Sequence, residues 1–537
     1  MTKSIKMAKV SAKGGFNLFW GLATSTIISA IGVILVARLL SPSEYGLVAI
    51  ALMAPNIITI FRDWGVNSAM IKYTAQYNSE NKTAHIKSIL VAGLLFELVL
   101  GLSLSFISFL LSGFLATNIF QRPDIEPLIQ MASFTIFTGA LLKAAQSIFT
   151  GTEKMELDSI IMVCQSALKT VLMPLLVILG LGTFGAILGS TIAFLVAGLI
   201  SILLLYTTVY RNLHKTNDAK LEIIETIKTM FKYGLPLSIS AILSGFLTQF
   251  YNFLIAIYCT DLMIGNYNVA ANFAVLITFF ATPITTVLFP AFSKLNPQKE
   301  KETLRNVFQF SVKYAALLVV PAVAAVIALS QPAISTLFGE KYIDAPLYLT
   351  LYTIIYLYSA FGSLSLRNLI AGQGKTKFNL KLTLITSTIG FPLSLLLIPK
   401  FGIIGLIATT LTAGIPSLII GLWWIKKHFT ATIDLASSAK ILLASTLAAA
   451  ITYAVISRLN LPNWTRLTIG ALIFLATYTT TTPLIGAINK TDTQILREML
   501  NELGPLSYLF KLPLNIIEKL TLTTQKTRTT KNKTQKS

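Results

Sequence analysis

Charged residues are scarce in this chain. They make up 12% of its 537 residues, about half the share that soluble domains carry, whereas hydrophobic residues make up 54%. Runs without any charge, such as 14–37 and 180–210, are long enough to cross roughly 30 Å of hydrocarbon as helices. The composition therefore argues against a large soluble protein and predicts an all-α polytopic membrane protein.

Cysteine and histidine are also rare. The two cysteines, Cys164 and Cys259, suggest no disulfide framework, and the three histidines lie in polar connections without metal-ligand spacing. The sequence contains no nucleophile–base constellation and no glycine-rich phosphate loop. We therefore predict no cofactor, no metal site and no enzymatic activity.

Hydropathy predicts about fourteen membrane spans. They lie near residues 14–37, 45–61, 88–113, 127–149, 159–179, 184–209, 233–259, 264–290, 314–338, 345–366, 382–398, 402–425, 441–457 and 467–488.

The basic residues give the predicted orientation. Of the 43 Lys and Arg residues, 35 fall in the N-terminus, the even-numbered connections and the C-terminus. Cytoplasmic loops are enriched in Lys and Arg, so both termini are predicted to be cytoplasmic in a multi-pass protein of the plasma membrane. The net charge of +21 is mainly this topology signal, and no nucleic-acid partner is expected.

The chain also repeats itself. GTFGAILGSTIA at 182–193 matches GIIGLIATTLTA at 402–413, and four further pairs of segments align in chain order at offsets of 219 to 222 residues. This period equals six predicted spans, so the two halves share one orientation, as in the parallel repeats of many transporters. A substrate pathway would then lie between the halves.

The repeat divides the chain into four predicted parts. Residues 1–220 and 221–430 form two six-helix lobes, and 431–490 add a pair of helices. Residues 491–537 form an amphipathic segment followed by a basic, disordered tail, which either lies on anionic membrane lipid or is simply solvated.

Residues 37–73 have the sequence ARLLSPSEYGLVAIALMAPNIITIFRDWGVNSAMIKY. This segment resembles the signature around the first two helices of polysaccharide flippases, a branch of the multidrug/oligosaccharidyl-lipid/polysaccharide exporter superfamily. The resemblance covers roughly residues 10–430 and includes the counterpart segment 264–295. It implies a transporter that moves a lipid-linked glycan, of polyprenyl phosphate or pyrophosphate type, from the cytoplasmic to the outer leaflet by alternating access. Glycan-assembly enzymes are further candidate partners.

Ionisable residues inside the predicted spans are the first candidates for substrate binding, because a charge in hydrocarbon is costly. Glu97 and Lys169 each lie about ten residues into a span, roughly 15 Å deep, and Lys143 lies nearer a cytoplasmic end. The resemblance implies a cationic cavity in which both lysines attract phosphate, with Glu97 as their counter-charge or as a proton or cation site. The alternative is a Glu97–lysine pair that only joins helices.

Other candidates lie at span ends or inside the span 233–259. Arg62 and Asp63 follow one span and Arg367 ends another, and all three lie on the predicted cytoplasmic side. They either meet the substrate at the inward opening or only fix the topology. Gln249 and Asn252 either line the cavity or bridge neighbouring helices.

Two other functions stay open. A cation-coupled multidrug exporter of the same superfamily would share the fold, but the spans 14–37 and 233–259 lack the acidic residue that this branch usually uses. A membrane glycosyltransferase or polymerase would need catalytic carboxylates near a large outer loop. The predicted outer loops are short, and their acidic residues form no compact motif.

Overall fold

The computed structural model describes residues 3–62, 64–213, 222–293, 295–489, 492–494, 497, 515 and 518. Within these residues all regular secondary structure is helical, which confirms the predicted all-α class. Eight described helical segments are long and apolar enough to cross a membrane, or nine if the bent pair Ala345–Phe361 and Ser363–Gly372 is one span. The total of fourteen spans stays a prediction.

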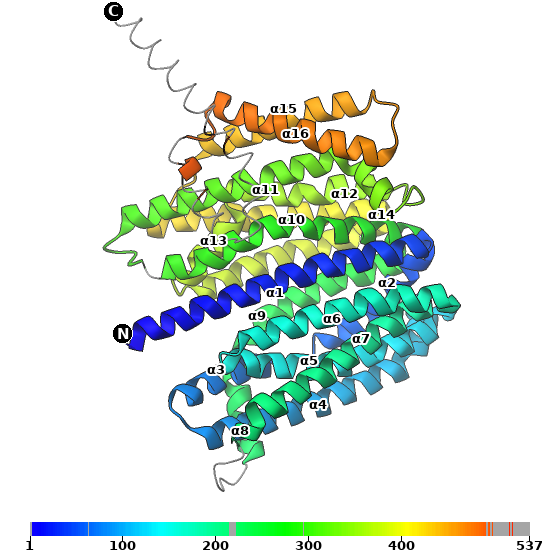
Figure 1. Ribbon diagram of the computed structural model, residues 1–537, viewed down its shortest axis with the longest axis vertical. Coiled ribbons are helices and arrows are strands. Elements are labelled where there is room, and N and C mark those ends of the chain that lie inside the picture. The colour runs from blue at the N-terminus through cyan, green and yellow to red at the C-terminus, as the bar shows by residue number, and fades with distance from the viewer. Residues whose placement is uncertain are drawn as a thin grey trace, which may run out of the picture. The chain divides into compact units, whose positions relative to one another are not determined.

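Sixteen labelled α-helices follow one another along the described chain (Figure 1). In the first part of the sequence they are α1 (Lys3–Leu39), α2 (Pro42–Thr59), α3 (Val66–Ser79), α4 (Thr83–Phe114), α5 (Glu126–Gly151), α6 (Met155–Leu176), α7 (Gly182–Leu205) and α8 (Arg211–Leu213). The later helices are α9 (Ile223–Tyr258), α10 (Asp261–Ser293), α11 (Lys301–Leu337), α12 (Ala345–Thr353), α13 (Ser363–Gly372), α14 (Thr376–Phe429), α15 (Leu435–Ile456) and α16 (Asn463–Ile485).

The helices group into two compact units. The first contains Met1–Asn272 and Ser387–Thr409, and the second contains Phe273–Thr386 and Thr410–Ser537. Helix α9 therefore belongs to the same unit as α1–α8. The four parts predicted from the repeat, with boundaries at 220, 430 and 490, stay predictions.

Helix α4 shows how the first unit packs. Large apolar side chains such as Val99, Phe106 and Leu110 are exposed, whereas the opposite face buries Gly101, Ser105, Ser108 and Ser112. The Ser105 hydroxyl donates to the Ser133 carbonyl on α5 at 2.9 Å, and Ser108 Oγ lies 2.7 Å from Ser133 Oγ. Small and hydroxyl-bearing interfaces with apolar exteriors are typical of membrane helices, which pack without a hydrophobic driving force between them.

The SPSEYG motif of the family signature forms the start of α2. The Glu44 amide donates to the Ser41 hydroxyl at 3.2 Å, and the Ser41 amide donates to the Glu44 carboxylate at 2.7 Å. Pro42 occupies the first turn, where its missing N–H costs no hydrogen bond. This part of the signature is therefore a capping box that fixes where the helix begins.

The two glycines that open the repeated GxxG segments share an unusual backbone conformation. Gly182, at the start of α7, has φ 49° and ψ −131°, and Gly402, inside α14, has φ 54° and ψ −128°. Residues with a side chain rarely adopt this conformation. Each glycine separates two helical segments, and the repeat itself stays a prediction.

In the second unit, α15 and α16 lie side by side (Figure 1) and pack against α11. A buried ion pair fastens the residues after α16 to α11: Lys313 Nζ lies 2.6 Å from the Asp492 carboxylate, which also accepts from the Tyr314 hydroxyl at 3.2 Å.

Candidate functional site

The site is built around an interruption between α2 and α3. Helix α2 ends at Thr59 and α3 begins at Val66, where Gly65 has a φ of 81°. The sequence predicts a cytoplasmic connection after residue 61, but α3 continues there and packs against α4, α5 and α9.

Arg62 lies in this interruption and is 9% exposed. Its Nε lies 3.6 Å from Oε2 of Glu97 on α4, and its Nη1 donates to the Ile136 carbonyl on α5 at 3.3 Å. Glu97 is only 1% exposed. Two opposite charges are thus buried together, an arrangement in which removing one partner leaves the other charge uncompensated.

Two uncharged side chains complete the network. Asn67 on α3 donates from its amide to Oε1 of Glu97 at 2.6 Å. The Ser147 hydroxyl on α5 lies 3.0 Å from Oδ1 of Asn67, and both residues are buried. Neither Asn67 nor Ser147 was predicted from the sequence. The signal for Ser147 is its spacing, because it lies four residues after the candidate Lys143 and so shares a helix face with it.

Lys143 extends the same face of α5. Ile136, Gly139, Lys143 and Ser147 recur at intervals of three and four residues, so they share one side of the helix. A Cβ added to Gly139 would lie 3.2 Å from Nη1 of Arg62, so the guanidinium covers this face. The Lys143 side chain is exposed and acts electrostatically on Asp158 in the first turn of α6. Arg62, Glu97 and Lys143 therefore lie in one region of the first unit.

The other predicted residues lie elsewhere. Lys169 is half-buried on α6, which packs mainly against α1 and α7. Asn252 donates to Gln249 on α9 at 3.1 Å. Arg367 is exposed on α13 in the second unit, and Asp63 lies outside the described residues.

The polar pair on α9 faces the interrupted helix. A Cβ on Gly245 would lie 4.0 Å from Ile60, two residues before Arg62. Gln249 and Asn252 follow Gly245 by four and seven residues and so share its helix face. Their helix face is therefore the one that meets Ile60 at Gly245.

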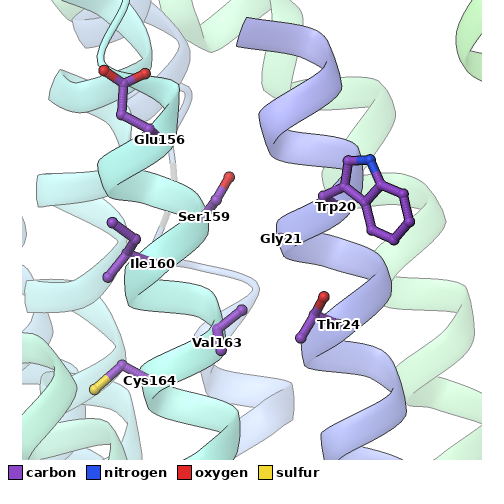
Figure 2. Close-up of a pocket in the computed structure, with 8 residues that line it drawn as sticks. All are labelled: Trp20, Gly21, Thr24, Glu156, Ser159, Ile160, Val163 and Cys164. Carbon is purple, nitrogen blue, oxygen red and sulfur yellow. The ribbon is translucent and has the colours of Figure 1, made fainter. Parts of the chain in front are cut away.

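A separate open pocket of about 500 Å³ lies between α1 and α6 (Figure 2). Figure 2 shows Thr24 on α1 and Ser159 and Val163 on α6 facing one another, with Glu156 at one end. The eight described lining residues include none of the predicted binding residues. The pocket is therefore separate from the Arg62–Glu97 network.

Similarity to known proteins places the chain in a family. The polysaccharide biosynthesis protein family matches residues 35–346, more than half of the chain. The chain belongs to this family. The matched range includes α2–α5, so the Arg62–Glu97 network lies within the part of the chain that defines family membership.

Two relatives and one solved structure illustrate this similarity. An uncharacterized membrane protein of Methanocaldococcus jannaschii is 24% identical over 389 residues, which cover 69% of this chain and 75% of the relative. The probable low-salt glycan biosynthesis flippase Agl15 of Haloferax volcanii is 21% identical over 269 residues, covering 49% of this chain and 56% of the relative. The solved structure of the lipid II flippase MurJ in an inward closed conformation matches with a TM-score of 0.70 and 17% identity, over 86% of this chain and 97% of that one. At this identity, the likeness to MurJ shows the fold alone.

Proposed function

We propose that the protein is a flippase that moves a lipid-linked oligosaccharide from the cytoplasmic to the outer leaflet by alternating access. Three observations support this function: membership of the polysaccharide biosynthesis family, similarity to a chain named as a glycan biosynthesis flippase, and the fold shared with a lipid II flippase. The cargo is the polar head of a polyprenyl phosphate or diphosphate, which carries negative charge. Glycan-assembly enzymes supply and consume it.

The buried guanidinium of Arg62 is the observation that carries the substrate assignment. It lies in a helix interruption with its Nε making no hydrogen bond among the described atoms, so donors remain for an anionic ligand. Arginine binds phosphate through several donors in a fixed planar geometry. Exposed Lys143, on the face of α5 that Arg62 covers, adds a second positive charge.

Glu97 then has a defined role. In the absence of cargo its carboxylate compensates the Arg62 charge at 3.6 Å, while Asn67 holds the carboxylate in place. An arriving phosphate competes for the guanidinium and takes over that compensation. Glu97 therefore keeps the buried guanidinium of Arg62 charged, and a phosphate can still displace the carboxylate from it. Lys169 on α6 lies outside this network, and in this proposal it is a second, separate positive charge for the cargo.

The orientation is part of the proposal. Both termini face the cytoplasm and the protein lies in the plasma membrane, which the distribution of Lys and Arg supports. Residues 1–220 and 221–430 act as the two lobes of the cycle, and Arg367 lies at the inward opening. Protease-accessible tags at each terminus test this orientation in right-side-out vesicles, where both tags should be protected.

Transport can be measured with purified protein in liposomes that contain a fluorescent polyprenyl diphosphate oligosaccharide. An added glycosidase that cannot cross the membrane cleaves the outward-facing glycan, and active protein should make the protected fraction accessible. The Arg62→Gln/Glu97→Gln double variant leaves neither charge unpaired, and we expect it to be at least about tenfold slower. A charge-assisted hydrogen bond contributes about 1.5–3 kcal/mol, which corresponds to a tenfold effect or more.

A matched control replaces the exposed Lys400 by Gln, and it should transport at the normal rate. Equal rates for the double variant and the wild type would remove Arg62 from the site. If the liposomes instead took up a fluorescent organic cation in response to an ion gradient, and did not move the glycan lipid, the drug-exporter alternative would replace the flippase.

A further inference from the structure

Arg122 joins three segments of the first unit at one end of α9. It lies in the connection between α4 and α5, and its Nε is 2.6 Å from the Asp261 carboxylate. Its Nη1 donates to the Ala256 carbonyl at 2.6 Å, and its Nη2 donates to the Cys259 carbonyl at 2.8 Å. One guanidinium therefore binds both the end of α9 and the first residue of α10.

The hydrogen bonds of Arg122 to the end of α9 are favourable for two physical reasons. The Ala256 and Cys259 carbonyls lie at the C-terminus of α9, where helix carbonyls lack partners within the helix. A cation is favourable there because of the helix dipole, and hydrogen bonds from a charged donor are shorter and stronger than neutral ones. The Arg122 side chain comes from more than 130 residues away in the sequence, so it ties distant parts of the chain together.

A tight glycine crossing lies at the same place. A Cβ added to Gly46 in α2 would lie 1.9 Å from the Asp261 carbonyl oxygen, and a Cβ added to Gly265 in α10 would lie 1.8 Å from the Pro42 carbonyl oxygen. The first turns of α2 and α10 are thus in backbone contact beside the Arg122–Asp261 pair. By the predicted topology, this end of the helices faces the outer side of the membrane.

The opposite end of α9 is held differently. Gly65 and Gly234 approach so closely that a Cβ on Gly65 would lie 2.1 Å from the Gly234 carbonyl oxygen. The Lys72 ammonium lies 3.8 Å from the centre of the Tyr233 ring. The contacts described there are a backbone crossing and a cation–π contact, whereas the Arg122 end carries an ion pair and two charge-assisted hydrogen bonds.

We propose that Arg122 and Asp261 form a lock that keeps the outer end of the transport pathway closed. This inference rests on the proposed flippase function, because it assigns the two sides of the lock to the two lobes, 1–220 and 221–430. To release cargo outward, the lobes must separate where α2 and the Arg122 connection meet α9 and α10. Arg122 is thus a positioning residue that sets how often the outer end opens, and it does not bind cargo.

The chain contains its own probe for this opening. Cys259 is 3% exposed and its carbonyl is one of the groups that Arg122 holds. In a Cys164→Ser background it is the remaining cysteine. Its reaction with a membrane-impermeant maleimide therefore reports when the end of α9 beside Arg122 becomes exposed. We expect Arg122→Gln to accelerate labelling about tenfold in right-side-out vesicles, and Asp261→Asn to have a smaller effect because the carbonyl contacts remain.

Two controls separate a lock from general loosening of the fold. Cys164 on α6, studied in a Cys259→Ser background with a permeant maleimide, should react at the same rate with and without Arg122→Gln. Arg458→Gln, which changes an exposed arginine on the same predicted side, should leave Cys259 labelling unchanged.

Acceleration at Cys259 alone, and from the outer side alone, supports the lock. The lock is overturned if neither Arg122→Gln nor Asp261→Asn accelerates labelling of Cys259. It is also overturned if both cysteines react faster, or if labelling accelerates only in inside-out vesicles. Labelling needs no cargo, so it can support the lock even if the protein fails to move a lipid-linked glycan in the liposome assay.

Discussion

The Arg62–Glu97 pair makes a quantitative prediction about stability. Glu97→Gln keeps an amide oxygen that can accept from Asn67, but it removes the only charge recorded within 4 Å of Arg62 among the described residues. Leaving one member of a buried ion pair uncompensated typically costs about 3–5 kcal/mol. The exposures of 9% and 1% for the two residues place this pair in that class, whereas exposed pairs contribute little.

The double variant Arg62→Gln/Glu97→Gln removes both charges together. Because no charge is then buried alone, it should be more stable than Glu97→Gln, with a coupling energy of at least about 2 kcal/mol between the two sites. Thermal unfolding of the detergent-solubilised protein measures the order of the three proteins: wild type, then double variant, then Glu97→Gln.

The matched control is Glu80→Gln, which breaks the exposed Glu80–Lys82 pair and should leave the unfolding temperature unchanged. If Glu97→Gln were as stable as the wild type, or the double variant were the least stable of the three, the two charges would not depend on each other. The proposed exchange of carboxylate for phosphate would then lose its physical basis.

Two further predictions concern other parts of the chain. Lys169→Ala should slow glycan-lipid transport while leaving the amount of protein in the membrane unchanged, with Lys400→Ala as the exposed control. Normal transport by the variant would remove Lys169 from the proposed binding residues. Gly182→Ala should destabilise the protein by about 1–3 kcal/mol because alanine is strained at φ 49°, whereas Gly414→Ala, whose Cβ meets nothing within 4 Å in a helix, should stabilise it by about 0.5–1 kcal/mol. Unfolding temperatures measure both glycine changes, and equal shifts would contradict the backbone argument.

The sequence predicts the described membrane-length helices because their signal is local. A long uncharged run can only be satisfied as a helix in hydrocarbon, and Glu97 and Lys169 stand out because they interrupt such runs. Helix α3 has no such signal: VNSAMIKYTAQYNS is too polar for a hydropathy scan, so Arg62 looks like the end of a helix. Its buried place between α2 and α3 follows from packing of α3 against α4, α5 and α9, which no local pattern encodes.

Partners across the fold are the second kind of information that the sequence withholds. In the sequence Arg122 resembles an ordinary outer-loop charge. Two of its partners are backbone carbonyls at the C-terminal end of α9, and any residue type could supply them. The predicted lysine partners of Glu97 had the right charge, yet the ion pair recorded for Glu97 is with Arg62. Charge predicts that a buried carboxylate needs a cation, but only the helix arrangement decides which cation reaches it.

The predicted repeat gives the location of these charges a further meaning. The repeat offset of 222 places Ile284 opposite Arg62, and offsets of 219 and 221 place Ala316 and Gly390 opposite Glu97 and Lys169. The corresponding positions in the second half are therefore apolar or small. If the halves descend from one ancestor, the charged network belongs to the first half alone, and the phosphate of the proposed cargo would be held there by one lobe. A binding site whose charged residues all come from one lobe can stay bound to the cargo while the other lobe moves away. This property suits a cycle that opens one end of the pathway at a time.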